Sequence, residues 1–186
     1  GLLTAALVGY TNSGKSTLLN ALTQGGSPSE DRLFSTLDPV TRRLRLPSGR
    51  TVLLTDTVGF IQKLPTSVVA AFRATLEEIG DSTLIAHVVD LSHPKAAEQA
   101  EVVEALLADL GLAETRRLLA LNKLDLLEAS DSGEERPGAA TFRADRPGTL
   151  MISATTGAGL DDLSTEIDEA VGDFFAVGTP VEVRAG

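Results

Sequence analysis

Short apolar runs alternate with longer stretches in which apolar residues recur at helical spacing. Four runs are short and apolar and predict buried strands, at 2–8, 84–89, 118–121 and 150–152. Four longer stretches predict amphipathic helices, at 15–23, 66–79, 96–110 and 160–175. Strands that alternate with helices in this way favour a parallel sheet covered on both faces.

A β-hairpin is predicted between the first two helices. Residues 42–46 alternate between polar and apolar, Pro47-Ser48-Gly49 is a turn sequence, and 51–55 is apolar again. Segments 24–40 and 129–147 are rich in Gly, Ser, Pro and charged residues, which predicts long loops, the second of them an insertion. We therefore expect one α/β domain, with a mostly parallel sheet and one antiparallel hairpin strand.

The composition limits the catalytic groups and metal sites that the chain can provide. The chain has 186 residues, 42% of them hydrophobic, and no apolar run approaches the roughly 20 residues of a membrane span. It contains no cysteine and only two histidines, which excludes thiol chemistry and disfavours a histidine-built metal centre. Catalysis would have to come from hydroxyls, carboxylates, lysine, backbone amides and an oxygen-liganded ion.

Charge is unevenly distributed. The formal net charge of −10 argues against a nucleic-acid partner when it is taken for the whole chain. Residues 1–75 nevertheless carry eight basic and four acidic residues, whereas 76–186 carry eight basic and twenty-two acidic ones. The first part, at +4, needs a separate explanation, whereas the acidic remainder is explained by a solvated surface.

A phosphate-binding loop is predicted where the first strand passes into the first helix. Residues 9–16 match G-x-x-x-x-G-K-[ST], in which glycines allow backbone N–H groups to converge on phosphates. Lys15 would reach the β- and γ-phosphates, and Ser16 would offer its hydroxyl to Mg²⁺. The alternative is a glycine-rich turn of purely structural use.

Guanine selectivity is predicted at the end of a later strand. In Asn122-Lys123-Leu124-Asp125, the Asp125 carboxylate can accept hydrogen bonds from N1–H and the 2-amino group of guanine, a donor pair that adenine lacks. Ser153-Ala154-Thr155 follows the last strand and can direct backbone N–H groups at the guanine oxygen.

Two further segments complete a nucleotide switch. Asp56 ends a strand and can hold Mg²⁺ through water, while the Gly59 N–H can bond the γ-phosphate. Thr36 is the candidate for a second hydroxyl on Mg²⁺, with Ser35 and Thr41 as alternatives. Phe60 stands where Ras-like GTPases place a water-orienting Gln, which predicts slow intrinsic hydrolysis.

These motifs in order resemble those of the HflX family of GTPases. The resemblance rests on 9–18, on Phe34-Ser35-Thr36-Leu37-Asp38-Pro39, on 56–61, and on Leu64-Pro65 followed by 71–78. It implies a P-loop NTPase with a Ras-like G domain, GTP/GDP and Mg²⁺ as ligands, and coupling to the large ribosomal subunit, with a role in splitting stalled or idle ribosomes. Asn12 resembles an Asn that several GTPases use beside a K⁺ ion; a purely structural Asn is the alternative.

The predicted site falls into three groups of residues. Lys15, Thr36 and Gly59 are expected to act in catalysis, and Ser16, Thr36 and Asp56 to hold the metal. Residues expected to contact the nucleotide are Gly9, Tyr10, Thr11, Asn12, Ser13, Gly14, Lys15, Ser16, Thr17, Phe34, Ser35, Thr36, Leu37, Asp38, Asp56, Thr57, Val58, Gly59, Asn122, Lys123, Leu124, Asp125, Ser153, Ala154 and Thr155.

The remaining expectations concern organisation and partners. Residues 1–178 are expected to form the G domain and 179–186 the truncated start of a C-terminal segment, in a piece of a longer cytoplasmic protein. We expect a monomer with neither membrane nor DNA as partner. His87 is interpreted as a core or partly exposed histidine rather than a catalytic base, and the acidic residues of 96–110 as a solvated face. The alternatives are a GTP-dependent docking module with negligible hydrolysis, an Obg- or Era-like ribosome-assembly GTPase, and a small-molecule kinase or ATPase.

Overall fold

The computed structural model describes residues 3–23, 40–57, 59, 65–79, 83–128, 141–142, 144–146 and 148–177. Within them, six strands form one sheet in the order β2-β3-β1-β4-β5-β6. The strands are β1 (Thr4–Gly9), β2 (Val40–Arg45), β3 (Thr51–Asp56), β4 (Thr83–Asp90), β5 (Arg117–Asn122) and β6 (Leu150–Met151). All neighbouring strands are parallel except β2 and β3, which form the antiparallel hairpin at the sheet edge.

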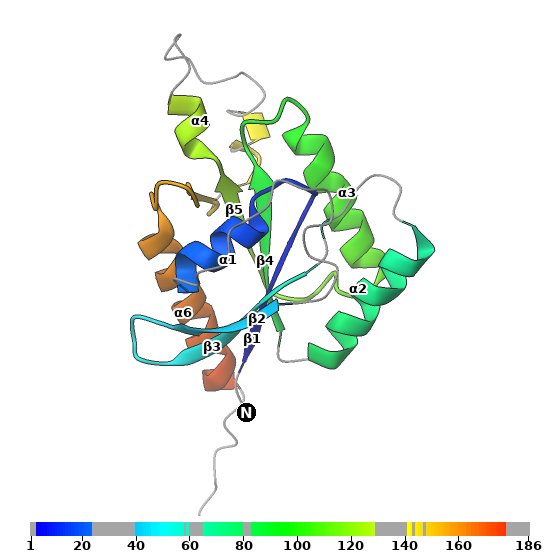
Figure 1. Ribbon diagram of the computed structural model, residues 1–186. Helices are drawn as coiled ribbons and strands as arrows, with labels where there is room; N and C mark the ends of the chain where they lie inside the picture. Colours follow the sequence, from blue (N-terminus) through cyan, green and yellow to red (C-terminus); the bar gives the residue numbers. More distant parts are fainter. Residues whose placement is uncertain are drawn as a thin grey trace, which may run out of the picture.

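Helices cover both faces of this sheet (Figure 1). They are α1 (Lys15–Thr23), α2 (Thr66–Ile79), α3 (Ala96–Asp109), α4 (Leu124–Glu128) and α6 (Leu160–Val177). On one face, Leu18 and Leu19 of α1 and Ile167 of α6 pack into the largest apolar cluster. On the other face, Phe72 of α2 and Val103 of α3 pack against the sheet. The predicted α/β class with a Ras-like G-domain arrangement is confirmed.

Burial explains why the central strands read as continuous apolar runs. Every residue of β1 is buried, because parallel neighbours flank it and helices cover both of its faces. Edge strand β2 alternates instead: Leu44 is buried, whereas Arg43 and Arg45 are exposed. The hairpin prediction is confirmed, with strand ends one or two residues from the predicted ones.

Two elements differ from the sequence-based expectation. Short helix α4 begins at Leu124, inside the predicted base-recognition loop. Residues 141–142 and 144 are helical, although the composition of 129–147 predicts an insertion loop, and Phe142 is buried against the sheet. The rest of that insertion lies outside the described residues, apart from 145–146. The tail 179–186 and residues 24–39 of the predicted loop 24–40 also lie outside them, whereas Val40 already belongs to β2.

Candidate nucleotide site

The predicted phosphate loop turns tightly between β1 and α1. Asn12 and Gly14 adopt positive φ angles of 62° and 96°, and the loop is closed by a 3.2 Å hydrogen bond from Ser13 N to Tyr10 O. Gly9 is required by close packing, because a Cβ there would lie 2.5 Å from Val88 O and 2.6 Å from Ser13 Oγ. The backbone therefore adopts the tight strand–turn–helix path that the motif predicts.

Lys15 and Ser16, the first residues of α1, both contact the carboxylate that ends β3. Lys15 Nζ lies 3.8 Å from Asp56 Oδ1, and Ser16 Oγ donates a 2.8 Å hydrogen bond to Asp56 Oδ2. Lys15 is only 6% exposed, and this burial lowers the pKa of its ammonium group, an effect that the Asp56 carboxylate opposes. The structure thus brings together three residues that the sequence assigned to phosphate and metal binding.

Asn122 joins the predicted base-recognition loop to the phosphate loop. Its Nδ2 donates a 2.9 Å hydrogen bond to Ser13 O, and its Oδ1 accepts a 3.0 Å hydrogen bond from Ala154 N. A Cβ on Gly14 would collide with the same Asn122 amide, so glycine is needed there for space as well as for its positive φ. Three segments far apart in the chain are therefore held together by one buried side chain.

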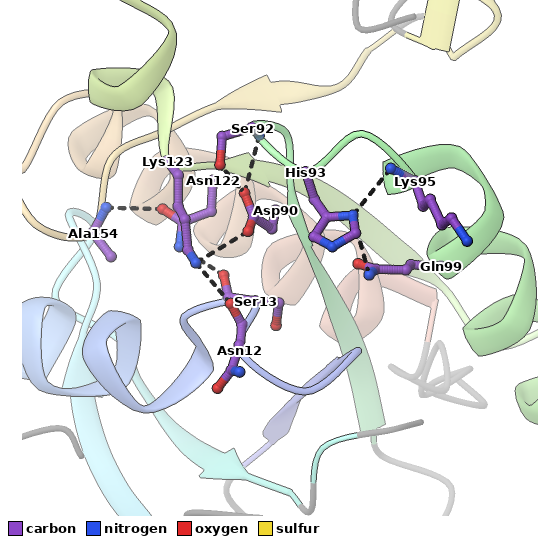
Figure 2. A network of polar contacts seen from close by, with 10 residues as sticks. All are labelled: Asn12, Ser13, Asp90, Ser92, His93, Lys95, Gln99, Asn122, Lys123 and Ala154. Atoms are coloured by element: carbon purple, nitrogen blue, oxygen red, sulfur yellow. Dashed lines mark hydrogen bonds and ion pairs between the residues drawn. The ribbon is translucent and has the colours of Figure 1, made fainter. Parts of the chain in front are cut away.

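Lys123 makes a second link between the two loops (Figure 2). Its Nζ donates to Asn12 O at 2.8 Å and forms an ion pair with Asp90 Oδ2 at 3.1 Å. Lys123 itself has a positive φ of 68°. Asp90 ends β4 and is held by the backbone N–H and hydroxyl of Ser92, at 3.0 and 2.5 Å.

Asp90 is a site residue that the sequence motifs do not include. The available signal was its place at the carboxyl end of a parallel strand, the edge at which ligands bind in open α/β sheets. Its register partner in β5 is Asn122, which places the two residues side by side.

Asp125 is oriented by the loop that follows β6. Ser153 Oγ donates a 2.7 Å hydrogen bond to Asp125 Oδ1 and accepts one of 3.1 Å from Thr156 N. Leu124 N in turn donates to Ile152 O at 3.1 Å. The arrangement fixes one oxygen of the Asp125 carboxylate, while Thr155 is exposed at the surface of this loop.

Other predicted contact residues have structural roles. Thr57 is buried and its hydroxyl donates a 2.6 Å hydrogen bond to Leu7 O, which ties the segment after β3 to β1. Tyr10 packs against the apolar cluster that contains Phe72. A Cβ on Gly59 would lie 3.0 Å from Thr11 Cγ2 and 3.5 Å from Lys15 Nζ, so Gly59 lies beside the phosphate loop.

Residues 34–38, which include Thr36, together with Val58 and Phe60, lie outside the described residues. Thr17 belongs to the first turn of α1.

The acidic residues of α3 are exposed, as the pattern of residues 96–110 predicts. One of them, Glu104, also contacts His87 and Arg117, which the sequence interpretation did not include. His87 is buried in β4, which is the first of the two alternatives, core or partly exposed, that the sequence leaves open. The helical spacing predicts which side of α3 faces solvent. The partners of Glu104 on β4 and β5 could not be predicted from the sequence of α3 alone.

Among the described helices, none combines the length and the apolar character needed to cross a bilayer.

Comparison with known proteins places this geometry in a family. Residues 4–123 match the family model described as 50S ribosome-binding GTPase. Proteins named GTPase HflX from Caldanaerobacter subterraneus, Magnetococcus marinus and Escherichia coli are 51%, 47% and 40% identical over 88%, 100% and 95% of this chain. The chain covers 35%, 46% and 40% of their lengths, so it spans less than half of each relative.

Solved structures show the same fold. A GTP-binding protein from Sulfolobus solfataricus in complex with GDP is 26% identical, with a TM-score of 0.68 over 92% of this chain and 53% of that one. A point variant of Era from Aquifex aeolicus, bound to GDP.AlF4⁻, is 24% identical, with a TM-score of 0.71 over 90% of this chain and 56% of that one, a likeness that shows the fold alone.

The family match, the HflX-named relatives and the joined phosphate and base-recognition loops agree with one another. The chain belongs to the 50S ribosome-binding GTPase family and is an HflX-type G domain.

Proposed function

We propose that the chain is a GTP-binding and GTP-hydrolysing switch domain in a protein that acts on the large ribosomal subunit. The observation that carries this proposal is the pair of links from Asn122 and Lys123 to the phosphate loop, at 2.9 and 2.8 Å. These two hydrogen bonds fix the distance between the phosphate loop and the base-recognition loop. A bound nucleotide has to span that distance. A structural turn would need neither link.

The choice of guanine rests on Asp125. Ser153 fixes one oxygen of its carboxylate at 2.7 Å, and a carboxylate held in this way can accept hydrogen bonds from N1–H and the 2-amino group. Adenine would leave the acceptor without a partner, at a cost of about 1–3 kcal/mol. This argument disfavours the kinase and ATPase alternatives.

Ser16 and Asp56 are suitable ligands for Mg²⁺. Their oxygens lie 2.8 Å apart, and hydroxyl and carboxylate oxygens are the donors that this ion prefers. Thr36 is proposed as a further ligand. When bound, Mg²⁺ would neutralise charge on the β- and γ-phosphates. Lys15 would contribute a second positive charge to the phosphates, and the N–H of Gly59 a hydrogen bond to the γ-phosphate.

Hydrolysis is proposed to be slow in the isolated chain. The position after Gly59 is Phe60, which cannot orient a water molecule by hydrogen bonding. The expected result is a slow single-turnover phosphate release, accelerated when ribosomal subunits are added to the full-length protein. Fast turnover by this chain alone would contradict the proposal, and an absence of release even with ribosomes would favour the docking-module alternative.

A K⁺ ion beside the phosphates is proposed on the strength of Asn12. Its backbone oxygen accepts the Lys123 hydrogen bond, whereas its exposed side-chain amide has no hydrogen-bond partner among the described residues. The amide is therefore available to a ligand. Hydrolysis measured in equal concentrations of KCl and NaCl tests this proposal, and equal rates would remove it.

The family description, 50S ribosome-binding GTPase, supports a ribosomal role. We propose that the full-length protein associates with the large subunit and promotes ribosome dissociation under stress. The test is co-sedimentation of that protein with purified large subunits in GTP, a non-hydrolysable analogue, or GDP. Equal binding in all three states would contradict a switch.

Arg43 and Arg45 are the proposed contact to ribosomal RNA. They lie on one face of edge strand β2 and both are exposed, whereas neighbouring Arg42 donates a 2.7 Å hydrogen bond to Asn20 Oδ1. Reversal of both charges to Glu is expected to weaken salt-dependent binding to subunits. The control is Arg116→Glu, which reverses one exposed arginine directly before β5, paired with Asp173 and outside the basic part of the chain.

A further inference from the structure

The Asp90 carboxylate has a different partner on each of its two oxygens. Oδ1 accepts hydrogen bonds from the backbone N–H and the hydroxyl of Ser92, at 3.0 and 2.5 Å. Oδ2 forms the ion pair with Lys123 Nζ, at 3.1 Å. Because both oxygens are engaged, the carboxylate is held in one orientation toward Lys123.

The main chain at Asp90 is fixed independently of that ion pair. Asp90 is the last residue of β4 and the register partner of Asn122 in β5. The N–H of the next residue, Leu91, donates a 3.0 Å hydrogen bond to Asn122 O. Asp90 therefore belongs to the sheet rather than to a loop, and a residue on such a rigid element can hold another side chain accurately.

Lys123 is the side chain that Asp90 holds. Its φ of 68° lies in the left-handed region, which is unfavourable for a residue with a side chain and persists where the surrounding groups impose it. Its ammonium group is fixed by Asp90 Oδ2 on one side and by Asn12 O, at 2.8 Å, on the other (Figure 2). One ammonium group thus joins the end of β4 to the phosphate loop.

We propose that Asp90 is a positioning residue for nucleotide binding and that it acts through Lys123. This inference rests on the proposed function, under which the segment from Asn122 to Asp125 faces the base. With its ammonium group held at the far end, the Lys123 stem has one fixed path. Its methylene groups then present a preformed apolar surface to the ring of the base.

The proposal separates nucleotide affinity from base selectivity. A methylene stem packs on any purine ring, because it carries no hydrogen-bond donor or acceptor that could distinguish one base from another. Asp125, on which the choice of guanine rests, is oriented by a different contact, the 2.7 Å hydrogen bond from Ser153 Oγ. Loss of the Asp90 contact should therefore weaken the binding of GTP, GDP and XTP by similar factors.

Asp90→Asn tests the proposal, because the amide supplies one acceptor oxygen where the carboxylate supplies two. Titration with fluorescent nucleotides should show GTP and GDP bound about tenfold more weakly, with an unchanged ratio of GTP to XTP affinity. The single-turnover rate at saturating GTP should equal that of the wild type, since the γ-phosphate is assigned to Lys15 and Gly59. The control is Asp109→Asn, the same change at the exposed end of α3, which should leave affinity unchanged.

A double-mutant cycle shows whether Asp90 acts through Lys123. Lys123→Met keeps the stem but removes the ammonium group, and it should weaken GTP binding at least as much as Asp90→Asn does. Adding Asp90→Asn to Lys123→Met should change the affinity by less than about twofold. Losses that multiply in the double variant would identify a general structural effect and overturn the proposal.

Three other results would also overturn it: wild-type affinity in Asp90→Asn, a loss confined to GTP, or an altered ratio of GTP to XTP affinity. If Asp90→Asn does not fold, Ser92→Ala replaces it, because this change removes the hydroxyl donor to Oδ1 and keeps the backbone donor. Ser92→Ala should weaken GTP binding about threefold, and unchanged affinity would have the same consequence. A wild-type chain that bound no GTP would contradict the proposed function as well, whereas the other outcomes leave that function intact.

Discussion

Asn122 Nδ2 donates a 2.9 Å hydrogen bond to the backbone oxygen of Ser13, 109 positions earlier in the chain. The same amide group accepts from Ala154 N through Oδ1 at 3.0 Å. Both contacts are buried, so the side chain acts as a fixed spacer between the phosphate loop and the two loops proposed to contact the base.

Asn122→Ala should therefore destabilise the protein and weaken GTP binding. The substitution leaves the Ser13 carbonyl and the Ala154 N–H buried without partners, at a combined cost of about 3 kcal/mol. Urea unfolding and nucleotide titration measure the two effects. Asn122→Asp is a second variant: it keeps an acceptor for Ala154 N, but it replaces the donor with a charged oxygen that faces Ser13 O, so it should destabilise the protein as well. If Asn122→Ala unfolds at the wild-type urea concentration, the spacer role is wrong.

Asp125→Asn should shift base preference from guanine to xanthine nucleotides. The amide of Asn can donate to the 2-oxo group of xanthine, whereas it loses the second acceptor needed by guanine. Competition between GTP and XTP for a fluorescent nucleotide measures the shift, expected to be at least about tenfold in the affinity ratio. Asp161→Asn, a change of the same type in the first turn of α6, provides the control. An unchanged ratio would show that Asp125 does not contact the base.

Gly14→Ala should destabilise the chain more than Gly49→Ala does. Both glycines have positive φ, at 96° and 89°, so each substitution carries a backbone cost of about 1–2 kcal/mol. A Cβ at Gly49 meets nothing within 4 Å, whereas at Gly14 it collides with the Asn122 amide. The difference in unfolding free energy between the two variants measures the close approach alone, and equal losses would contradict it.

Glu104→Gln should reduce stability at neutral pH and have less effect in acid. The hydrogen bond from His87, together with the positive charges of Arg117 and Arg146, holds the pKa of Glu104 below its ordinary value of 4.5, although burial opposes this. A lowered carboxyl pKa adds stability above the unfolded-state pKa, and this is lost as pH falls through the folded pKa.

Urea unfolding at pH 7 and at pH 3 tests that dependence. The difference in unfolding free energy between wild type and Glu104→Gln should be smaller at the lower pH. Glu101→Gln changes an exposed carboxylate on the same helix and should show a smaller difference at pH 7. If this difference in unfolding free energy is as large at pH 3 as at pH 7, the lowered pKa of Glu104 does not contribute to stability.

Local patterns were sufficient to predict most of this fold. The apolar runs of β1 and β4 are continuous because these strands are covered on both faces, and the period of α1 is clear because one side packs on the sheet. Helix α4 has only five residues, too few for a helical period to show, so the sequence did not predict it. The burial of Phe142 could not be predicted, because one buried residue in a polar segment gives no periodic signal.

The candidate site also contains some residues that the sequence predicts and others that it does not. Lys15, Asp56 and Asn122 belong to contiguous motifs, and the motif fixes their chemistry. Asp90 and the pairing of His87 with Glu104 depend on which strand and helix lie side by side, and that information is held in the tertiary arrangement rather than in any one segment.

The contact between Lys15 and Asp56 has a thermodynamic consequence for the order in which ligands bind. Under the proposed function, the Asp56 carboxylate that faces the Lys15 ammonium would also hold Mg²⁺. The ammonium would therefore contact phosphate fully only when Mg²⁺ replaces it beside this carboxylate. Metal and nucleotide would then each raise the other's affinity by the same factor, as linkage requires. The domain would discriminate against nucleotide alone and metal alone, and would respond chiefly to the complex of the two.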